Sequence, residues 1–404
     1  MNKYSALLAL LSVLFFSNCG NDTTTYNDES DTDSTSILAT DVTVNSLTET
    51  TDYISSGFTF LSPEQIDLNL QAVGGDDYTE VYGFNVPSAN RASGFVWYGD
   101  DETSAEWRPQ GIAGYTNGSE KYLLVSWYAQ TSSYQGARIT LIDINPDSNT
   151  YLQYRHILLV QNTISSSTSY TQLTTFAPLD IHAGGMACYK NQLYVASTDL
   201  GIRVFDLDKI IEVISSNADT KCGVDSNGDA YAFGYKYILP QTGYYKIEGA
   251  SPYSTIQLNY EENELWTAQY YAKSNTTITP KAFGFPMDSS GTLSESGQKE
   301  IAPRNSLFTN YNAYGMQGIF RKGDSTWLSC TGAPESFNST ARLIRYKDGD
   351  VNSEQYVWPY GAESLYYDAD TDYLWCLTEY EVNGGNNEEH NNRCVFAVKF
   401  EQYQ

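Results

Sequence analysis

The sequence has little of several residue types that mark common functional sites. Its 404 residues include three histidines, four methionines and six cysteines. No CxxC pair and no Cys/His spacing typical of a zinc site occurs. The GxSxG, HExxH, P-loop and GxGxxG motifs are absent as well. These absences exclude the zinc, serine-hydrolase and nucleotide-binding classes that such short motifs identify.

Basic residues are scarce relative to acidic ones. The chain has 23 Lys and Arg against 49 Asp and Glu, which gives a formal net charge of −26. A surface this negative disfavours nucleic acids and anionic membranes as partners. It suits a cationic ligand or a metal ion, and it is also a simple means of keeping a protein soluble.

The longest apolar run is at the N-terminus. Residues 5–16 (SALLALLSVLFF) have the length of the hydrophobic region of an export signal and are too short to span a bilayer comfortably. The following Ser17-Asn18-Cys19-Gly20 resembles the lipobox of bacterial lipoproteins, with Asn18 at a position usually held by a small residue. The resemblance implies that Cys19 is lipidated and anchors the protein to the bacterial outer membrane, at the cell surface or in the periplasm. Ordinary secretion is the alternative.

The segment after Cys19 is polar and acidic. Residues 21–36 (NDTTTYNDESDTDSTS) offer almost nothing to bury, which is typical of a disordered tether. We therefore expect a signal peptide at 1–18, a disordered acidic tether at 19–55 and a globular domain at 56–404. Order is expected to begin within residues 55–70.

Five further cysteines follow Cys19, an odd number that leaves at least one thiol free in an oxidising compartment. The strand pattern places Cys188 at the end of one strand and Cys222 in a loop on the same face, so we hypothesise a Cys188–Cys222 disulfide. Cys376 and Cys394 are expected to pack as small hydrophobic residues.

A pattern of three short strands repeats five times after residue 105. Each repeat has a short apolar run, then an aromatic-rich run, then a run in which apolar residues alternate with others. A unit that recurs at tens of residues, with strands too short to bury a face alone, predicts an all-β fold of the β-propeller class. The second runs are 122–128, 193–199, 265–271, 327–333 and 374–380, and the third runs are 138–144, 202–208, 282–288, 342–348 and 395–401.

The last repeat ends before a fourth strand. Residues 93–98 (SGFVWY), which precede the first repeat, supply a candidate for it, and pairing of this strand with 395–401 would close the ring and remove the exposed sheet edges. We therefore expect five blades closed by an N-terminal strand. Six blades are the alternative if residues 65–90 form a degenerate blade, and a β-sandwich is the rival fold.

The loops between second and third strands are long, whereas those between first and second strands are short. Elaborated loops on one face of a rigid scaffold are the usual place for binding, so this face is the candidate functional surface. Residues that open the first strands converge there on the central channel. The candidate ligand residues at this channel mouth are Arg108, Gln110, Gln317, Glu363 and Glu379.

Two chemical roles are considered for the channel mouth. The oxygens of Glu363, Gln110 and Gln317 would suit a hard cation, so Ca2+ is the candidate cofactor. His182 could act as a general base oriented by Asp180. The Gly-Gly pair that follows His182 would let a backbone approach closely, and its purely structural use is tight strand packing. A polar channel mouth can also be simply water-filled.

Residues 180–207 (DIHAGGMACYKNQLYVASTDLGIRVFDL) resemble the repeat of a family of bacterial secreted and lipoprotein β-propellers. The likeness covers most of residues 95–400 and implies the fold without an activity. A looser similarity exists to propellers of the gluconolactonase and strictosidine-synthase type. That similarity implies a central metal held by carboxylates and amides, and Glu363 alone matches such a ligand position.

Three functions follow from these observations. The first is a surface-anchored, monomeric propeller whose long-loop face binds an extracellular glycan, peptide or protein. The second is a calcium-dependent hydrolase or lactonase with its site at the central channel. The third is a structural propeller that docks partners and has an inert channel.

Overall fold

The structure is a computed structural model in which thirteen segments, all within the compact unit Asp33–Gln404, are described. Cys19 and the predicted export signal lie outside them, as do residues 131–134, 272–278, 331–340 and 382–390 of the predicted long-loop face. The described segments are residues 37–39, 41–54, 57–130, 135–162, 170–216, 220–271, 279–301, 304–305, 311–312, 315–330, 341–348, 353–381 and 391–404.

The predicted repeats are confirmed as antiparallel sheets in which the first strand pairs with the second and the second with the third. The first strands are β8 (Trp107–Asn117), β14 (Met186–Tyr189), β21 (Tyr253–Asn259), β27 (Met316–Lys322) and β31 (Ala362–Asp368). The second strands are β9 (Glu120–Ala129), β15 (Gln192–Ser197), β22 (Glu264–Gln269), β28 (Ser325–Cys330) and β32 (Tyr373–Thr378). The third strands are β10 (Ala137–Asp143), β16 (Gly201–Asp206), β23 (Ala282–Pro286), β29 (Arg342–Lys347) and β33 (Cys394–Lys399).

A fourth strand adds to each of these sheets. Those strands are β11 (Gln153–Asn162), β20 (Tyr237–Glu248), β24 (Lys299–Ile301), β30 (Glu354–Val357) and β7 (Arg91–Val96). Other described elements are peripheral, among them the short helix α1 (Asp100–Thr103) and the inserted strands β18 (Lys221–Val224) and β19 (Ala230–Ala232).

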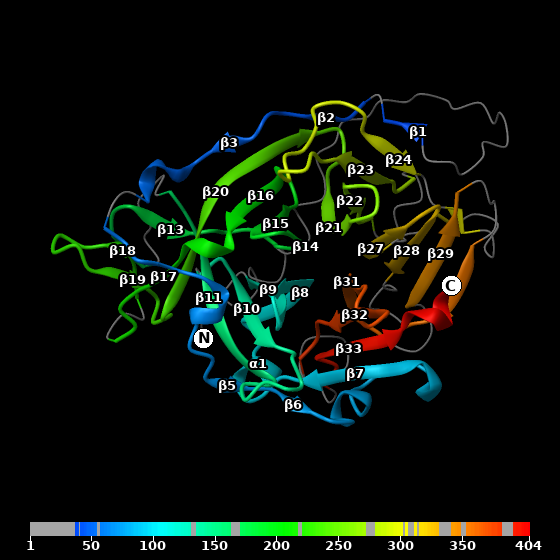
Figure 1. The fold of residues 1–404 in the computed structure, drawn as a ribbon, viewed down its shortest axis with the longest axis horizontal. Coiled ribbons are helices and arrows are strands. Elements are labelled where there is room, and N and C mark those ends of the chain that lie inside the picture. Colours follow the sequence, from blue (N-terminus) through cyan, green and yellow to red (C-terminus); the bar gives the residue numbers. More distant parts are fainter. Residues whose placement is uncertain are drawn as a thin grey trace, which may run out of the picture. The chain divides into compact units, whose positions relative to one another are not determined.

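The first strands contact one another in a closed cycle, and this makes the fold a β-propeller. β8 contacts β14, which contacts β21, then β27, then β31, and β31 contacts β8 again. Figure 1 shows these strands on the inner side of their sheets. Radially arranged sheets pack on both faces, so β10 is buried at all seven positions. A β-sandwich would bury only one face of each sheet.

The closure predicted from the sequence is confirmed. β7 pairs antiparallel with β33, and its register places Phe95 opposite Val395 and Ser93 opposite Ala397. Figure 1 shows these strands, from the two ends of the domain, side by side. The chain's beginning therefore completes the sheet made by its end, and no edge of β33 remains open on that side.

Three details differ from the sequence-based expectation. The first part of β20 pairs parallel with β11, and only its later part pairs with β16, which joins the first two sheets into one. Residues 65–90 form no separate sheet but contribute edge strands to the first and last sheets. Order begins earlier than residue 55, because β2 (Thr43–Val44) and β3 (Thr48–Glu49) pair with β20. Since two sheets are merged, the number of blades stays a prediction.

The predicted Cys188–Cys222 disulfide is not formed. Both residues are free and buried, Cys188 in β14 and Cys222 in the inserted strand β18. They belong to different hydrophobic clusters because the chain after β16 forms additional strands instead of a loop. Cys376 and Cys394 are also buried and free, and they pack in one cluster as predicted.

Candidate functional site

Four of the innermost strands begin with a β-bulge. In each of them, the register against the second strand shifts so that an extra residue leaves the ladder. A bulge re-aims the side chain that it releases, and bulges are common beside active sites. The residues released in this way include Gln110 in β8, Ser254 in β21, Gln317 in β27 and Glu363 in β31. Three of them, Gln110, Gln317 and Glu363, are residues predicted at the channel mouth.

The Gly184-Gly185 pair before β14 serves the packing of neighbouring strands. A Cβ atom on Gly184 would lie 2.1 Å from the carbonyl oxygen of Ser254, and one on Gly185 would lie 2.3 Å from the backbone nitrogen of Ile256. Only glycine allows β14 and β21 to approach this closely. The prediction that this glycine pair serves tight strand packing is therefore confirmed, because its backbone lies against β21.

The axis is crossed by hydrogen bonds just beyond the bulges. The Thr255 and Ser364 hydroxyls lie 3.1 Å apart, and the Gln257 side-chain amide donates to the Leu365 carbonyl oxygen. These bonds join β21 to β31, which are not neighbours in the cycle of first strands. The residues at the channel mouth are thereby separated from the cavity of about 450 Å3 that lies at the other ends of the first strands.

Glu363 and Glu379 form a buried carboxyl pair at the channel mouth. Their residues are 1% and 7% exposed. The Gln317 amide donates to Glu363 Oε1 at 3.0 Å, and the Gln110 amide donates to Glu379 Oε2. Among the described residues, no donor reaches Glu363 Oε2. The two carboxyls are close enough to hydrogen bond to each other once one of them holds a proton.

The charges at the channel mouth do not balance. Arg108 Nη1 lies 3.5 Å from Glu379 Oε1, and Arg108 Nη2 lies 3.7 Å from Glu381 Oε1. The fully buried Arg393 pairs with Glu381 at 3.0 Å and donates to the Glu379 backbone carbonyl. Two guanidinium groups thus face three carboxyl groups. Glu363 is the carboxyl without a paired cation among the described residues.

This imbalance shifts the pKa values of both glutamates. Burial, and then the charge of Glu379, raise the pKa of Glu363 well above its ordinary value. Burial raises the pKa of Glu379 too, while Arg108 and hydrogen bonds from Tyr380 and Gln110 oppose that rise. Two adjacent carboxyls that cannot both ionise share a proton. The arrangement can therefore donate a proton from one carboxyl and accept one at the other.

His182 lies against Tyr128 and near Arg108, and it forms no ion pair with a described carboxylate. Its ring is tilted against that of Tyr128, with the ring centroids 4.0 Å apart. Desolvation by the surrounding wall, and then the charge of Arg108, lower the pKa of His182 to about 4, although the side chain retains an exposed surface. Among the described residues, no hydrogen bond joins Asp180 to His182, and Asp180 is exposed. The catalytic role of His182 stays a prediction, with the ring neutral at pH 7.

The channel mouth does not fit a Ca2+ ion in this arrangement. Calcium takes six to eight oxygen ligands. Here the amides of Gln110 and Gln317 turn their N–H groups toward the carboxylates, and Arg108 already faces Glu379. In the part of the chain that is described, no group of three His, Cys, Asp or Glu side chains is arranged to hold a metal. A proton satisfies the carboxyl pair better than a divalent cation.

Sequence reasoning missed two residues of the site, Glu381 and Arg393. They lie on either side of residues 382–390, which are outside the described residues, and they meet only because β32 and β33 pair. The alternation Glu379-Tyr380-Glu381 at the end of a strand was the available signal, since it sends two carboxylates in one direction. The structure brings together all five residues predicted at the channel mouth.

In the described segments, no helix is both long enough and apolar enough to cross a membrane. No family model matches the chain, and no curated protein sequence matches it.

Several solved structures are similar in fold at low identity. PhoX from Pseudomonas fluorescens, solved with vanadate as a transition-state analogue, is 9% identical over 91% of this chain and 96% of its own, with a TM-score of 0.36. A gluconolactonase from Xanthomonas campestris is 9% identical over 85% and 99%, with a TM-score of 0.34. A GH43_1 enzyme from Xanthomonas citri is 8% identical over 73% and 91%, with a TM-score of 0.39. Likeness at this level gives no information on the activity of this chain.

Proposed function

We propose that the protein is a hydrolase whose channel mouth cleaves an ester or lactone by general acid–base catalysis. The observation that carries this proposal is the buried Glu363–Glu379 pair with its surplus carboxyl. A carboxylic acid kept protonated near neutral pH can donate a proton, and a neighbouring carboxylate can accept one. This is the enzymatic alternative considered above, without its calcium ion.

The reaction balances with water as the only co-reactant. Glu379 takes a proton from water, whose oxygen bonds to the carbonyl carbon, while Glu363 gives its proton to the carbonyl oxygen. When the tetrahedral intermediate collapses, the bond to the alcohol oxygen breaks. Glu379 then passes its proton to the leaving oxygen, and Glu363 recovers the proton from the former carbonyl oxygen. Both residues end in their starting states.

The spacing of the carboxyls favours an acyl substrate over a glycoside. Glycosidases hold their two carboxyls about 5–5.5 Å apart for retention and about 6.5–9.5 Å apart for inversion. Glu363 and Glu379 are within hydrogen-bonding reach of each other. Arg108, 5.2 Å from the centre of the Tyr380 ring, adds a cationic and aromatic wall that can orient a polar acyl group.

The test is hydrolysis of a panel of p-nitrophenyl esters and sugar lactones by the purified protein. Removing either member of an acid–base pair typically lowers the rate by a factor of about 10² to 10⁴. We expect Glu363→Gln and Glu379→Gln to lower kcat to this extent on any substrate that the wild type cleaves. Glu354→Gln, on the peripheral strand β30, is the matched control and should retain full activity.

Three outcomes would contradict the proposal. The first is an unchanged kcat in Glu363→Gln. The second is hydrolysis abolished by EDTA and restored by Ca2+, which would return the metal-dependent alternative. The third is the absence of hydrolysis across the panel by a folded wild-type protein.

We also propose that the protein is exported and lipid-anchored through Cys19, and that its long-loop face contacts an extracellular ligand. The support is the lipobox-like sequence and the acidic tether. Incorporation of labelled palmitate that is lost in Cys19→Ser tests the anchor, and incorporation retained by that variant would contradict it.

A further inference from the structure

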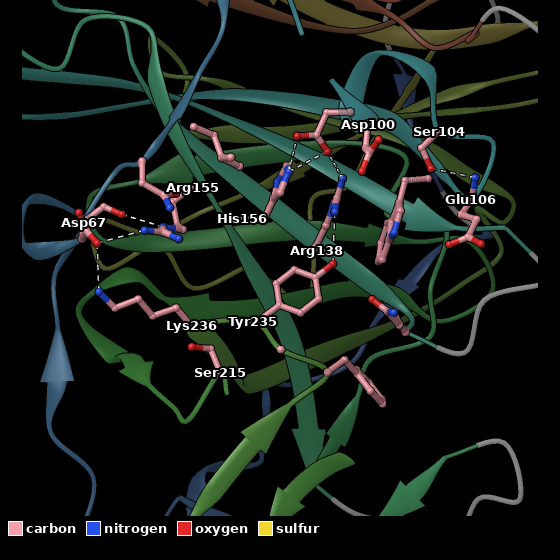
Figure 2. A pocket seen from close by; sticks show the side chains of 17 residues that line it. Asp67, Asp100, Ser104, Glu106, Arg138, Arg155, His156, Ser215, Tyr235 and Lys236 are labelled. Carbon is pink, nitrogen blue, oxygen red and sulfur yellow. Dashed lines mark hydrogen bonds and ion pairs between the residues drawn. The ribbon is translucent and has the colours of Figure 1, made fainter. Parts of the chain in front are cut away.

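A second cavity, of about 870 Å3, lies beside the first sheet, and none of the residues that line it is Glu363 or Glu379. Its walls come from β10, β11, α1, the segment before β5 (Leu70–Gln71), and the residues between β19 and β20. Figure 2 shows the side chains that line it. None of these residues takes part in the acid–base pair, so the cavity needs a separate explanation.

The centre of the cavity wall is a hydrogen-bonded polar cluster around Asp101. This carboxylate accepts from Arg138 Nη2 and from the Tyr154 hydroxyl, each at 2.7 Å, and His156 Nε2 lies 2.9 Å from it. The side chains of Arg138 and Asp101 are 8% and 13% exposed. Burial, and then Arg138, lower the pKa of His156. The cluster is therefore a rigid wall of balanced charge, seen at the centre of Figure 2.

One end of the cavity is cationic. Arg155 Nη2 and Lys236 Nζ each lie 3.1 Å from the same oxygen of Asp67, so two cations share one carboxylate. Glu212, which does not line the cavity, is 3.9 Å from Lys236 and well exposed, which makes it a weak partner. Figure 2 shows Arg155, Lys236 and Asp67 together at one side of the view.

The other end of the cavity is anionic. Asp100 and Glu106 line it, are exposed, and form no ion pair with any described residue. Figure 2 shows them on the side of the Asp101 cluster away from Asp67. An unpaired positive group on a ligand would gain two carboxylate partners here. Trp107 also lines the cavity, and its ring lies 4.3 Å from the Arg138 guanidinium carbon.

We propose that this cavity binds a short zwitterionic peptide, with its α-amino group at Asp100 and Glu106 and its carboxylate at Arg155 and Lys236. The charges of the two ends match those of such a ligand, and a ligand that fills only one end would leave the other uncompensated. The volume accommodates several residues. This site is independent of the proposed hydrolytic site.

The test is isothermal titration calorimetry of the full chain with oligoglycines of two to five residues. Each residue of an extended chain spans roughly 3.3–3.6 Å, so the series measures the distance between the charged ends. We expect one length to bind best. Acetylation of its amino group or amidation of its carboxylate should each weaken binding at least about tenfold, the size of one lost charge-assisted contact.

Single substitutions test which end of the cavity binds the amino group of the peptide and which binds its carboxylate. Glu106→Gln should weaken binding of the free peptide but not of its acetylated form, and Lys236→Met should weaken the free peptide but not its amide. Glu354→Gln is the control for surface charge. The proposal is overturned if no length binds, if capping changes affinity less than about twofold, or if an uncharged trisaccharide binds more tightly than every peptide.

Discussion

At the residue scale, the decisive feature is that Glu363 carries a buried carboxyl group that forms no ion pair with any described residue. The Gln317 amide donates to one of its oxygens, and the other accepts no hydrogen bond from the described residues. Polar groups buried in this way cost free energy unless they are neutralised. The raised pKa of Glu363 means that a proton on the pair lowers this cost, and the proposed hydrolysis would use that same proton.

The protonated pair makes stability depend on pH. The folded-state pKa of Glu363 is raised, so its stabilising effect is full below the unfolded value near 4.5 and is lost as pH rises toward the folded value. We expect the free energy of unfolding to fall above pH 4.5 by up to about 1.4 kcal/mol per pH unit for one proton. Glu363→Gln, which is neutral at every pH, should remove that fall. Urea unfolding of both proteins at pH 5, 6, 7 and 8 measures the difference, and parallel curves would contradict the protonated pair.

At the element scale, bulges and glycines together build the channel mouth. Each bulge turns one polar residue out of its ladder, and the glycines next to the bulges let neighbouring first strands approach closely. Gly111 faces Gly185, and a Cβ atom on Gly318 would lie 2.6 Å from the Glu363 carbonyl oxygen. The polar side chains therefore meet at the channel mouth only because the first strands behind them pack tightly.

Gly185→Ala tests this packing. Its Cβ would meet backbone atoms of β21, which cannot move aside as a flexible side chain can. We expect a loss of about 3 kcal/mol in the free energy of unfolding, typical of overpacking against a fixed neighbour. Gly118→Ala is the matched control. It has a left-handed φ of 60° but open space around it, so backbone strain alone should cost about 1 kcal/mol. Chemical denaturation measures both losses. If Gly185→Ala and Gly118→Ala lowered the free energy of unfolding equally, β14 and β21 could move apart without cost.

At the scale of the whole molecule, closure by β7 holds the two ends of the domain together. Phe95 and Trp97 are almost fully buried and pack with residues of both the first and the last sheets. Loss of this strand would open the edge of β33 and uncover its apolar residues. An edge of that kind is a template for aggregation.

Two truncations separate closure from other N-terminal contributions. A chain that begins at residue 58 lacks β1 to β3 but keeps β7, and we expect a monomer with a cooperative, somewhat lower thermal transition. A chain that begins at residue 99 also lacks β7, and we expect aggregation and loss of the cooperative transition. Light scattering after size exclusion, with calorimetry, measures both. A monomeric second chain with the melting temperature of the first would show that the ring does not need β7.

Much of the fold could be predicted because its signals are local. The strands of each repeat follow from runs of apolar and aromatic residues, and the closing strand follows from the missing strand of the last repeat. The double pairing of β20 with β11 and β16 is not such a local property, because it depends on the length of the strand and on two partners from different repeats. The additional strands around Cys222 gave no signal distinguishable from a loop, and the disulfide hypothesis failed with them.

The sequence by itself determined the propeller, its closure and the ring of polar residues that open the innermost strands, since the period and polarity of short segments suffice for these. Tertiary structure alone decided that Glu363 and Glu379 are buried together with raised pKa values, that Arg393 pairs with Glu381, and that a cavity lined by cationic and anionic residues lies beside the first sheet. A pKa and a charge balance depend on distances between side chains from different strands and on their burial. Neither quantity is present in the order of residues along the chain.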